Sequence, residues 1–172
     1  MSKFKIVGMV ALIAFAMSIV LVSGAVAAER GKLTFRHASY VTTVHTLKVP
    51  DVEGHVNILY EAKGINFYEK WGAAINSQIV SFDLTKGVGT YQGYMHTTFP
   101  DGSTQTTKFE GKTTTTATGV GLVTGIARSE GTWTYTKGTG KFEGIQGRGT
   151  LKTYTLGPGQ YYVDIEGEYT LP

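Results

Sequence analysis

The most constraining stretch of the chain runs from Gly131 to Lys152, GTWTYTKGTGKFEGIQGRGTLK. Trp133 and Tyr135 alternate there with threonines, a pattern typical of a strand with one face in a core. Glycines interrupt the rest of the stretch, and glycine is favoured where φ is positive or where two backbones approach closely. The stretch therefore predicts strands that bend, as at the rim of a barrel, with Phe142 and Ile145 free to cover apolar surface.

A long alternating segment opens the rest of the chain, from Lys32 to Lys48. In a strand, every second residue lies on the same face. One face of this segment carries Leu33, Phe35, His37, Ser39 and Val41. Because that face is largely apolar, we expect it to point inward and to bring His37 with it.

Turn signals divide the remaining sequence into further short strands. Pro100-Asp101-Gly102 between two alternating runs predicts a hairpin, since these residues suit tight turns. Lys63-Gly64 predicts another turn, and Gly157-Pro158-Gly159 a third. The expected strands are His55–Glu61, Ile65–Lys70, Ile79–Thr85, Thr90–Phe99, Ser103–Thr116, Thr150–Leu156 and Gln160–Leu171.

Two segments allow more than one interpretation. Trp71, Ile75 and Ile79 recur at helical spacing, so a short helix is an alternative there, although Gly72 disfavours it. The glycine-rich apolar segment from Gly119 to Ala127 is expected to form a bent strand or a rim loop.

About eight or nine closely spaced strands predict an all-β fold, a single antiparallel β-barrel of about eight strands. A β-sandwich is the structural alternative. The high glycine content, 23 residues, favours the barrel because closure requires bends. A barrel of about eight strands is just wide enough to hold one small ligand.

The run GTGKFEGIQGRGT, between a Trp/Tyr-bearing strand and a Thr/Tyr strand, resembles the late-barrel segment of the allene oxide cyclase and dirigent superfamily. The resemblance covers roughly the last third of the chain and implies an antiparallel barrel related in shape to the lipocalins. It also implies two activities, cyclisation of a reactive intermediate or orientation of phenoxy radicals. No position here matches a site motif of the family, so no catalytic residue is carried over.

The first 28 residues have the features of a signal peptide. Lys3 and Lys5 precede an uncharged run that ends in Ala25-Val26-Ala27-Ala28 before Glu29. We expect cleavage near Ala27 or Ala28, export to the periplasm or beyond, and a barrel domain over 29–172 with no membrane contact afterwards. An uncleaved anchor is the alternative, since about 20 apolar residues can span a bilayer.

Composition argues against several functional classes. Without Lys3 and Lys5, 14 Lys and Arg face 13 Asp and Glu, a net charge of +1 with no basic stripe for nucleic acid. The chain has no cysteine, which excludes disulfides and thiolate chemistry. The glycine runs lack the spacing of nucleotide-binding loops, so no cofactor is expected.

The four histidines, His37, His45, His55 and His96, lack the spacing of a metal site. His37 and His45 are expected on the same face of one strand but too far apart to share a metal. Hydrogen-bonded or surface positions are the favoured interpretation for all four.

The remaining candidate site is the lumen. Its predicted ligand-binding residues are Phe35, His37, Ser39, Tyr91 and Tyr161. An apolar pocket with few polar groups is a default binding site, so we expect an exported barrel that binds a small apolar or aromatic molecule. The alternatives are an allene oxide cyclase-like or dirigent-like activity, which a buried ionisable group with a shifted pKa would favour, and a structural envelope protein whose side chains simply fill the barrel. Whether the protein is an enzyme stays open at this point.

Overall fold

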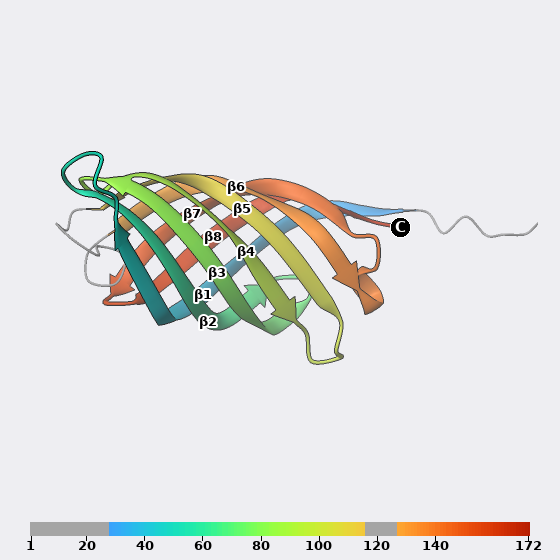
Figure 1. Cartoon of the computed structure of the whole chain (residues 1–172). Helices are drawn as coiled ribbons and strands as arrows, with labels where there is room; N and C mark the ends of the chain where they lie inside the picture. The colour runs from blue at the N-terminus through green and yellow to red at the C-terminus, as the bar shows by residue number, and fades with distance from the viewer. Residues whose placement is uncertain (1–27, 116–126) are drawn as a thin grey trace, which may run out of the picture.

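The computed structural model describes residues 28–115 and 127–172, in which eight antiparallel strands close into a barrel (Figure 1). Each strand pairs with the next, and the last pairs with the first. The elements are β1 (Glu29–Lys48), β2 (His55–Tyr68), β3 (Gly72–Thr85), β4 (Val88–Thr98), β5 (Thr104–Thr115), β6 (Ala127–Thr139), the 3₁₀ turn η1 (Gly140–Phe142), β7 (Gln146–Gly157) and β8 (Gln160–Leu171).

The predicted all-β antiparallel barrel of about eight strands is therefore confirmed, and the sandwich alternative is wrong. The expected leader lies outside the described residues. So does the expected rim segment Gly119–Ala127, apart from Ala127, which begins β6. Within the two described ranges, no helix has the length and hydrophobicity needed to cross a bilayer.

The inward face of β1 is the predicted one, but only over its first half. Phe35, His37 and Ser39 are all buried. The pairing of β1 with β2 then shifts register between Val41 and Thr43, as at a β-bulge. A bulge adds one residue to one strand and so exchanges the two faces beyond it. His45 is consequently exposed, and the expectation that it shares a face with His37 is wrong.

The predicted turn at Lys63-Gly64 is also wrong, because β2 runs without interruption from His55 to Tyr68. Gly64 lies directly against β1. A Cβ placed there would lie 2.3 Å from Ser39 Oγ, so the position requires a residue without a side chain. This glycine marks a close approach of two strands and not the end of one.

The helical alternative for the segment from Trp71 to Ile79 is wrong as well. Gly72 has φ +76° at the turn, and the chain then continues directly as β3. Ala74, Asn76, Gln78 and Val80 alternate as buried residues along it. The spacing of Trp71, Ile75 and Ile79 reflects a turn residue followed by the outer face of a strand.

The Pro100-Asp101-Gly102 hairpin is confirmed between β4 and β5. Gly102 adopts φ +82°, and its N–H donates to the Phe99 carbonyl at 2.9 Å. The Asp101 carboxylate accepts a hydrogen bond from the Ser103 N–H at 3.0 Å. Gly102 therefore has the positive φ, and Asp101 the side-chain-to-backbone hydrogen bond, for which these residue types are favoured in tight turns.

Aromatic side chains close the end of the barrel near this hairpin. The Phe142 ring, which η1 brings over the opening, lies 4.5 Å from that of Phe99 and 4.9 Å from that of Trp71. Phe142 is 1% exposed and Ile145 is also buried, which confirms that these two residues cover an apolar interior. The ammonium of Lys141 lies above the Phe99 ring, 4.9 Å from its centroid.

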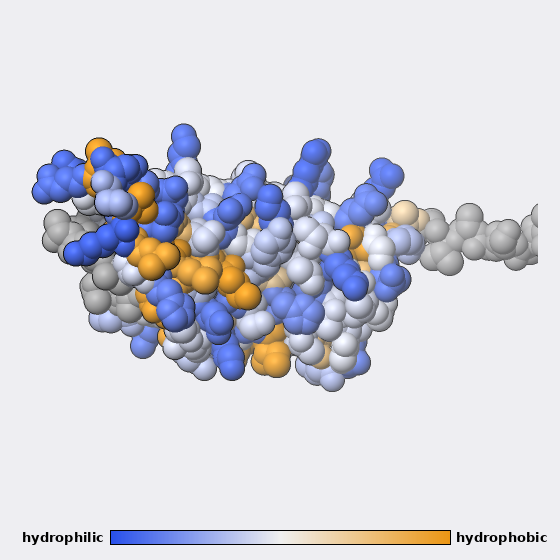
Figure 2. Space-filling view, in the orientation of Figure 1, coloured by the Kyte–Doolittle hydropathy of each residue, from blue (hydrophilic) through white to orange (hydrophobic). Residues whose placement is uncertain are grey.

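The outer surface is not uniformly polar. Figure 2 shows apolar side chains gathered over β2 and β3. Ile65 and Ile75 are paired there across the two strands, and each is about half exposed or more. Elsewhere the outer surface carries charge, and Glu166 and Glu168 of β8 point outward as predicted.

His55 holds the turn between β1 and β2 against β3. Its Nδ1 lies 2.6 Å from Asp51 Oδ1, and its Nε2 lies 2.7 Å from Asp83 Oδ1. The hydrogen bond with Asp51, followed by that with Asp83, raises the pKa of His55. This histidine thus has the structural, hydrogen-bonded role expected from the absence of metal-ligand spacing.

Replacing Trp133 with Ala is expected to lower the free energy of unfolding by about 3–5 kcal/mol, because the indole is 2% exposed and would leave a cavity. Urea unfolding of both proteins measures the change. Leu156→Ala is the control, since that side chain is 63% exposed and its loss should change stability by no more than about 0.5 kcal/mol. A Trp133→Ala effect as small as the control's would contradict the inward placement of the indole.

Candidate functional site in the barrel lumen

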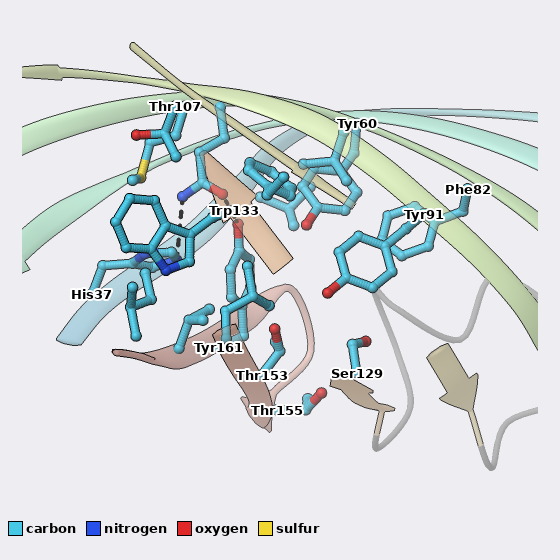
Figure 3. Close-up of a pocket in the computed structure, with 18 of the residues that line it drawn as sticks. His37, Tyr60, Phe82, Tyr91, Thr107, Ser129, Trp133, Thr153, Thr155 and Tyr161 are labelled. Atoms are coloured by element: carbon cyan, nitrogen blue, oxygen red, sulfur yellow. Dashed lines mark hydrogen bonds between the residues drawn. The ribbon is translucent and has the colours of Figure 1, made fainter. Parts of the chain in front are cut away.

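A cavity of about 40 Å³ lies inside the barrel and is lined by residues of all eight strands (Figure 3). Aromatic rings form much of its wall, including Phe35, Tyr60, Phe82, Tyr91, Trp133 and Tyr161. Hydroxyl groups of Thr107, Ser129 and Thr153 are placed between them. The lining contains no Asp, Glu, Lys or Arg among the described residues, so the interior is uncharged apart from any charge that His37 could carry.

Four of the five predicted site residues line this cavity: Phe35, His37, Tyr91 and Tyr161. His37 and Tyr161 lie next to each other, with ring centroids 6.1 Å apart in an edge-on arrangement. Ser39 does not line the cavity. Its hydroxyl instead accepts a hydrogen bond from Gln78 Nε2 at 3.0 Å.

Gln78 connects the predicted residues to one another. Its amide nitrogen also faces His37 Nε2 at 3.5 Å, and its carbonyl accepts from the Tyr161 hydroxyl at 3.2 Å (Figure 3). The side chain is 4% exposed. Gln78 therefore sets the relative positions of three groups on β1 and β8, although it comes from β3.

The Gln78 amide belongs to a larger buried network. Its nitrogen donates to Asn76 Oδ1 at 3.0 Å, and Asn76 Nδ2 donates to Asn66 Oδ1 at 2.6 Å. Asn66 Nδ2 reaches the Tyr68 hydroxyl at 3.1 Å, and that hydroxyl donates to Gln105 Oε1, also at 3.1 Å. Four amides thus extend across the lumen from β3 to β5.

The sequence could have identified Gln78 and Asn76, but the helical alternative obscured them. Along β3, Asn76, Gln78, Val80 and Phe82 alternate with exposed residues. The period of two that identified the inward face of β1 holds here as well. Thr107 of β5 was missed for another reason, because a threonine among many others gives no pattern that separates it from the wall.

His37 is the only histidine among the described lining residues, and burial controls its charge. Burial lowers the pKa of His37 from its ordinary value to about 3. The imidazole is therefore neutral at physiological pH. Burial likewise raises the pKa of Tyr161 to about 12, so its hydroxyl stays protonated.

Three buried polar atoms in the wall of the cavity have no hydrogen-bond partner among the described residues. They are Nδ1 of His37, the hydroxyl of Tyr91 and the hydroxyl of Thr107. Buried polar groups are normally paired, because an unpaired one loses its hydration without compensation. Three such atoms around one cavity mark places where a bound molecule could supply the missing partners.

The size of the cavity limits what it can hold without rearrangement. Since one water needs roughly 10–15 Å³ of such space, about 40 Å³ accommodates a few water molecules. A molecule with an aromatic ring requires side chains to move. Met95 and Phe109 line the cavity and are suited to this, because methionine is flexible and Phe109 is only partly buried.

Comparison with known proteins assigns no function to this chain. No protein-family model matches the sequence, and no curated protein matches it. Among solved structures, the barrel is similar to the pterocarpan synthase dirigent protein GePTS1, with a TM-score of 0.48 and 13% sequence identity over 84% of this chain and 86% of that chain. Neither value carries a functional assignment over to this chain.

The burial of His37 predicts an acid-dependent loss of stability. The unfolded chain binds a proton at this residue below about pH 6.5, whereas the folded protein does not until about pH 3. Stability therefore falls as the pH decreases between these values, by up to about 1.4 kcal/mol per pH unit. His37→Phe should remove this component, so the variant should lose less stability than the wild type between pH 6.5 and pH 5.

Urea unfolding at several pH values measures both proteins. His45→Phe is the matched control, because His45 is on the same strand but exposed. Parallel pH profiles for the wild type and His37→Phe would show that the imidazole is not buried in the neutral form.

Proposed function

We propose that this protein is an exported barrel that binds one small, uncharged, largely aromatic or apolar molecule in its lumen. The observation that carries the proposal is that polar atoms of His37, Tyr91 and Thr107 have no partner among the described residues and belong to the wall of a largely aromatic and apolar cavity. Concave, mostly apolar sites with a few placed polar groups are the usual form of small-molecule sites.

The uncharged side chains of the described cavity wall favour an uncharged ligand. An ionised group brought into this lumen would lose its hydration and find no opposite charge among the described lining residues. Neutral groups do not incur that penalty, and aromatic surface gains from contact with Tyr60, Phe82 and Trp133.

An allene oxide cyclase-like or dirigent-like activity is the alternative. His37 is a buried ionisable group with a shifted pKa, which is the feature expected of an enzyme, but its pKa of about 3 moves away from neutrality. A group with that pKa is a weak base, and at neutral pH its neutral form is a hydrogen-bond donor but not a general acid. Catalysis in this lumen would therefore depend on confining and orienting a reactive molecule. A structural role without ligand requires water to satisfy the unpartnered atoms.

Native mass spectrometry of the protein purified from its own host tests the binding proposal. We expect a species heavier than the polypeptide, from which denaturation releases one small molecule. His37→Phe should fold but lose that molecule, because the substitution removes the polar partner, whereas His45→Phe should retain it. Only the bare polypeptide mass in the wild type, or unchanged retention in a folded His37→Phe protein, would contradict the proposal.

Export is part of the proposal and rests on the leader-like sequence of residues 1–28. N-terminal sequencing of the protein recovered outside the cytoplasm should begin near Ala27 or Ala28. Recovery of a membrane-bound chain that still begins at Met1 would establish an anchor instead.

A further inference from the structure

The buried amides of the lumen have a defined direction, and it is set at Asn66. The nitrogen of this amide lies near two hydroxyls, those of Thr97 and Tyr68, and 3.8 Å from the sulfur of Met95. Both hydroxyls can accept from an N–H group, and the thioether sulfur beside them can only accept, so this position suits a donor. The structure accordingly turns the Asn66 amino group toward the two hydroxyls and its carbonyl toward Asn76.

The orientation of the Asn66 amide determines that of the Gln78 amide. Asn76 donates to the Asn66 carbonyl at 2.6 Å and so presents its own carbonyl to Gln78 Nε2 at 3.0 Å. The second N–H of Gln78 donates to Ser39 Oγ at 3.0 Å. Both protons of the Gln78 amide are then used, and its carbonyl accepts from Tyr161.

The orientation of Gln78 determines which nitrogen of His37 carries the proton. His37 Nε2 faces the Gln78 amino group at 3.5 Å, where a second N–H would be opposed donor to donor. A neutral imidazole has a single N–H. The proton therefore resides on Nδ1, which is the atom with no partner among the described residues.

We propose that the Nδ1–H of His37 selects the ligand, which is an uncharged aromatic molecule with a hydrogen-bond acceptor, such as a carbonyl oxygen, placed to accept from it. This inference rests on the proposed binding function and adds the chemistry of the ligand. A site built to hydrogen-bond its ligand rejects an analogue that lacks the partner group, because the buried N–H is then left unpaired. Gln78 acts as a positioning residue, since it fixes the proton without lying opposite the ligand's acceptor.

The first experiment measures the tautomer directly. A long-range ¹H–¹⁵N correlation spectrum of histidine-labelled protein, with His37→Phe used for assignment, should show a protonated Nδ1 and an unprotonated Nε2 on His37. A protonated Nε2 would overturn the inference, and it is the result expected if every amide in the network were reversed.

The second experiment uses two probes of nearly identical shape, acetophenone and α-methylstyrene, in which a C=CH₂ group replaces the C=O. The wild type should bind acetophenone about tenfold more tightly in titration calorimetry, the order of one neutral hydrogen bond. His37→Phe should lose this preference, and His45→Phe should keep it. Equal binding of both probes to the wild type would overturn the inference and leave the binding function standing. Failure of both probes to bind near their solubility limits would overturn the binding function and this inference with it.

Discussion

The barrel depends on aromatic rings that lie over glycines of neighbouring strands. Across the interior, Tyr91 is in register with Gly111, and Gly111 with Gly131. A Cβ on Gly131 would lie 2.6 Å from the Tyr91 hydroxyl, so this ring occupies the space that two side chains would otherwise fill. Trp133 is likewise in register with Gly149, and Gly149 with Gly167, where a Cβ would lie 2.7 Å from the indole. The indole N–H donates to the Glu166 carbonyl at 3.1 Å. Each pair of glycines thus admits one large ring, and the rings rather than an even layer of aliphatic side chains define the lumen.

This arrangement explains which parts of the fold the sequence could predict. Alternation identified the inward faces of β1, β6 and β8, because a period of two survives wherever one face is buried. Glycine was ambiguous, since the same residue type marks turns at Gly72 and Gly102 and close approach within a strand at Gly64. Nothing local distinguishes the two uses, because the atoms that exclude a Cβ at Gly64 belong to Ala38 and Ser39 on the neighbouring strand, far away in the sequence. The bulge after Val41 is hidden for a similar reason, as it shows only in the pairing of two strands.

The site was predictable as far as it depends on which face of its strand each residue occupies. Phe35, His37, Tyr91 and Tyr161 reach one cavity because each lies at an inward position of its strand. The contribution of Gln78 is different in kind, since its role depends on the three groups that two other strands, β1 and β8, place around its amide. Sequence patterns give the direction of a side chain, whereas a hydrogen-bond network requires the register of every strand that contributes to it.

Burying the amide network lowers stability compared with a core whose side chains are all apolar. A fully apolar filling would avoid the desolvation of four amides, and buried polar networks stabilise a fold only when every member is paired. Here the chain of amides ends in two groups without a hydrogen-bond partner in the part of the chain that the structure describes, the amide nitrogen of Gln105 and Nδ1 of His37. The amides between them are paired throughout, so the deficit is confined to the ends of the network. Only the His37 end faces the cavity, since Gln105 is not part of its lining. Among the described residues, the unpartnered buried side-chain atoms lie at the two ends of the network, around the cavity and on the Tyr135 hydroxyl. In the binding site that we propose, the direction of the amides decides which group of His37 the cavity presents.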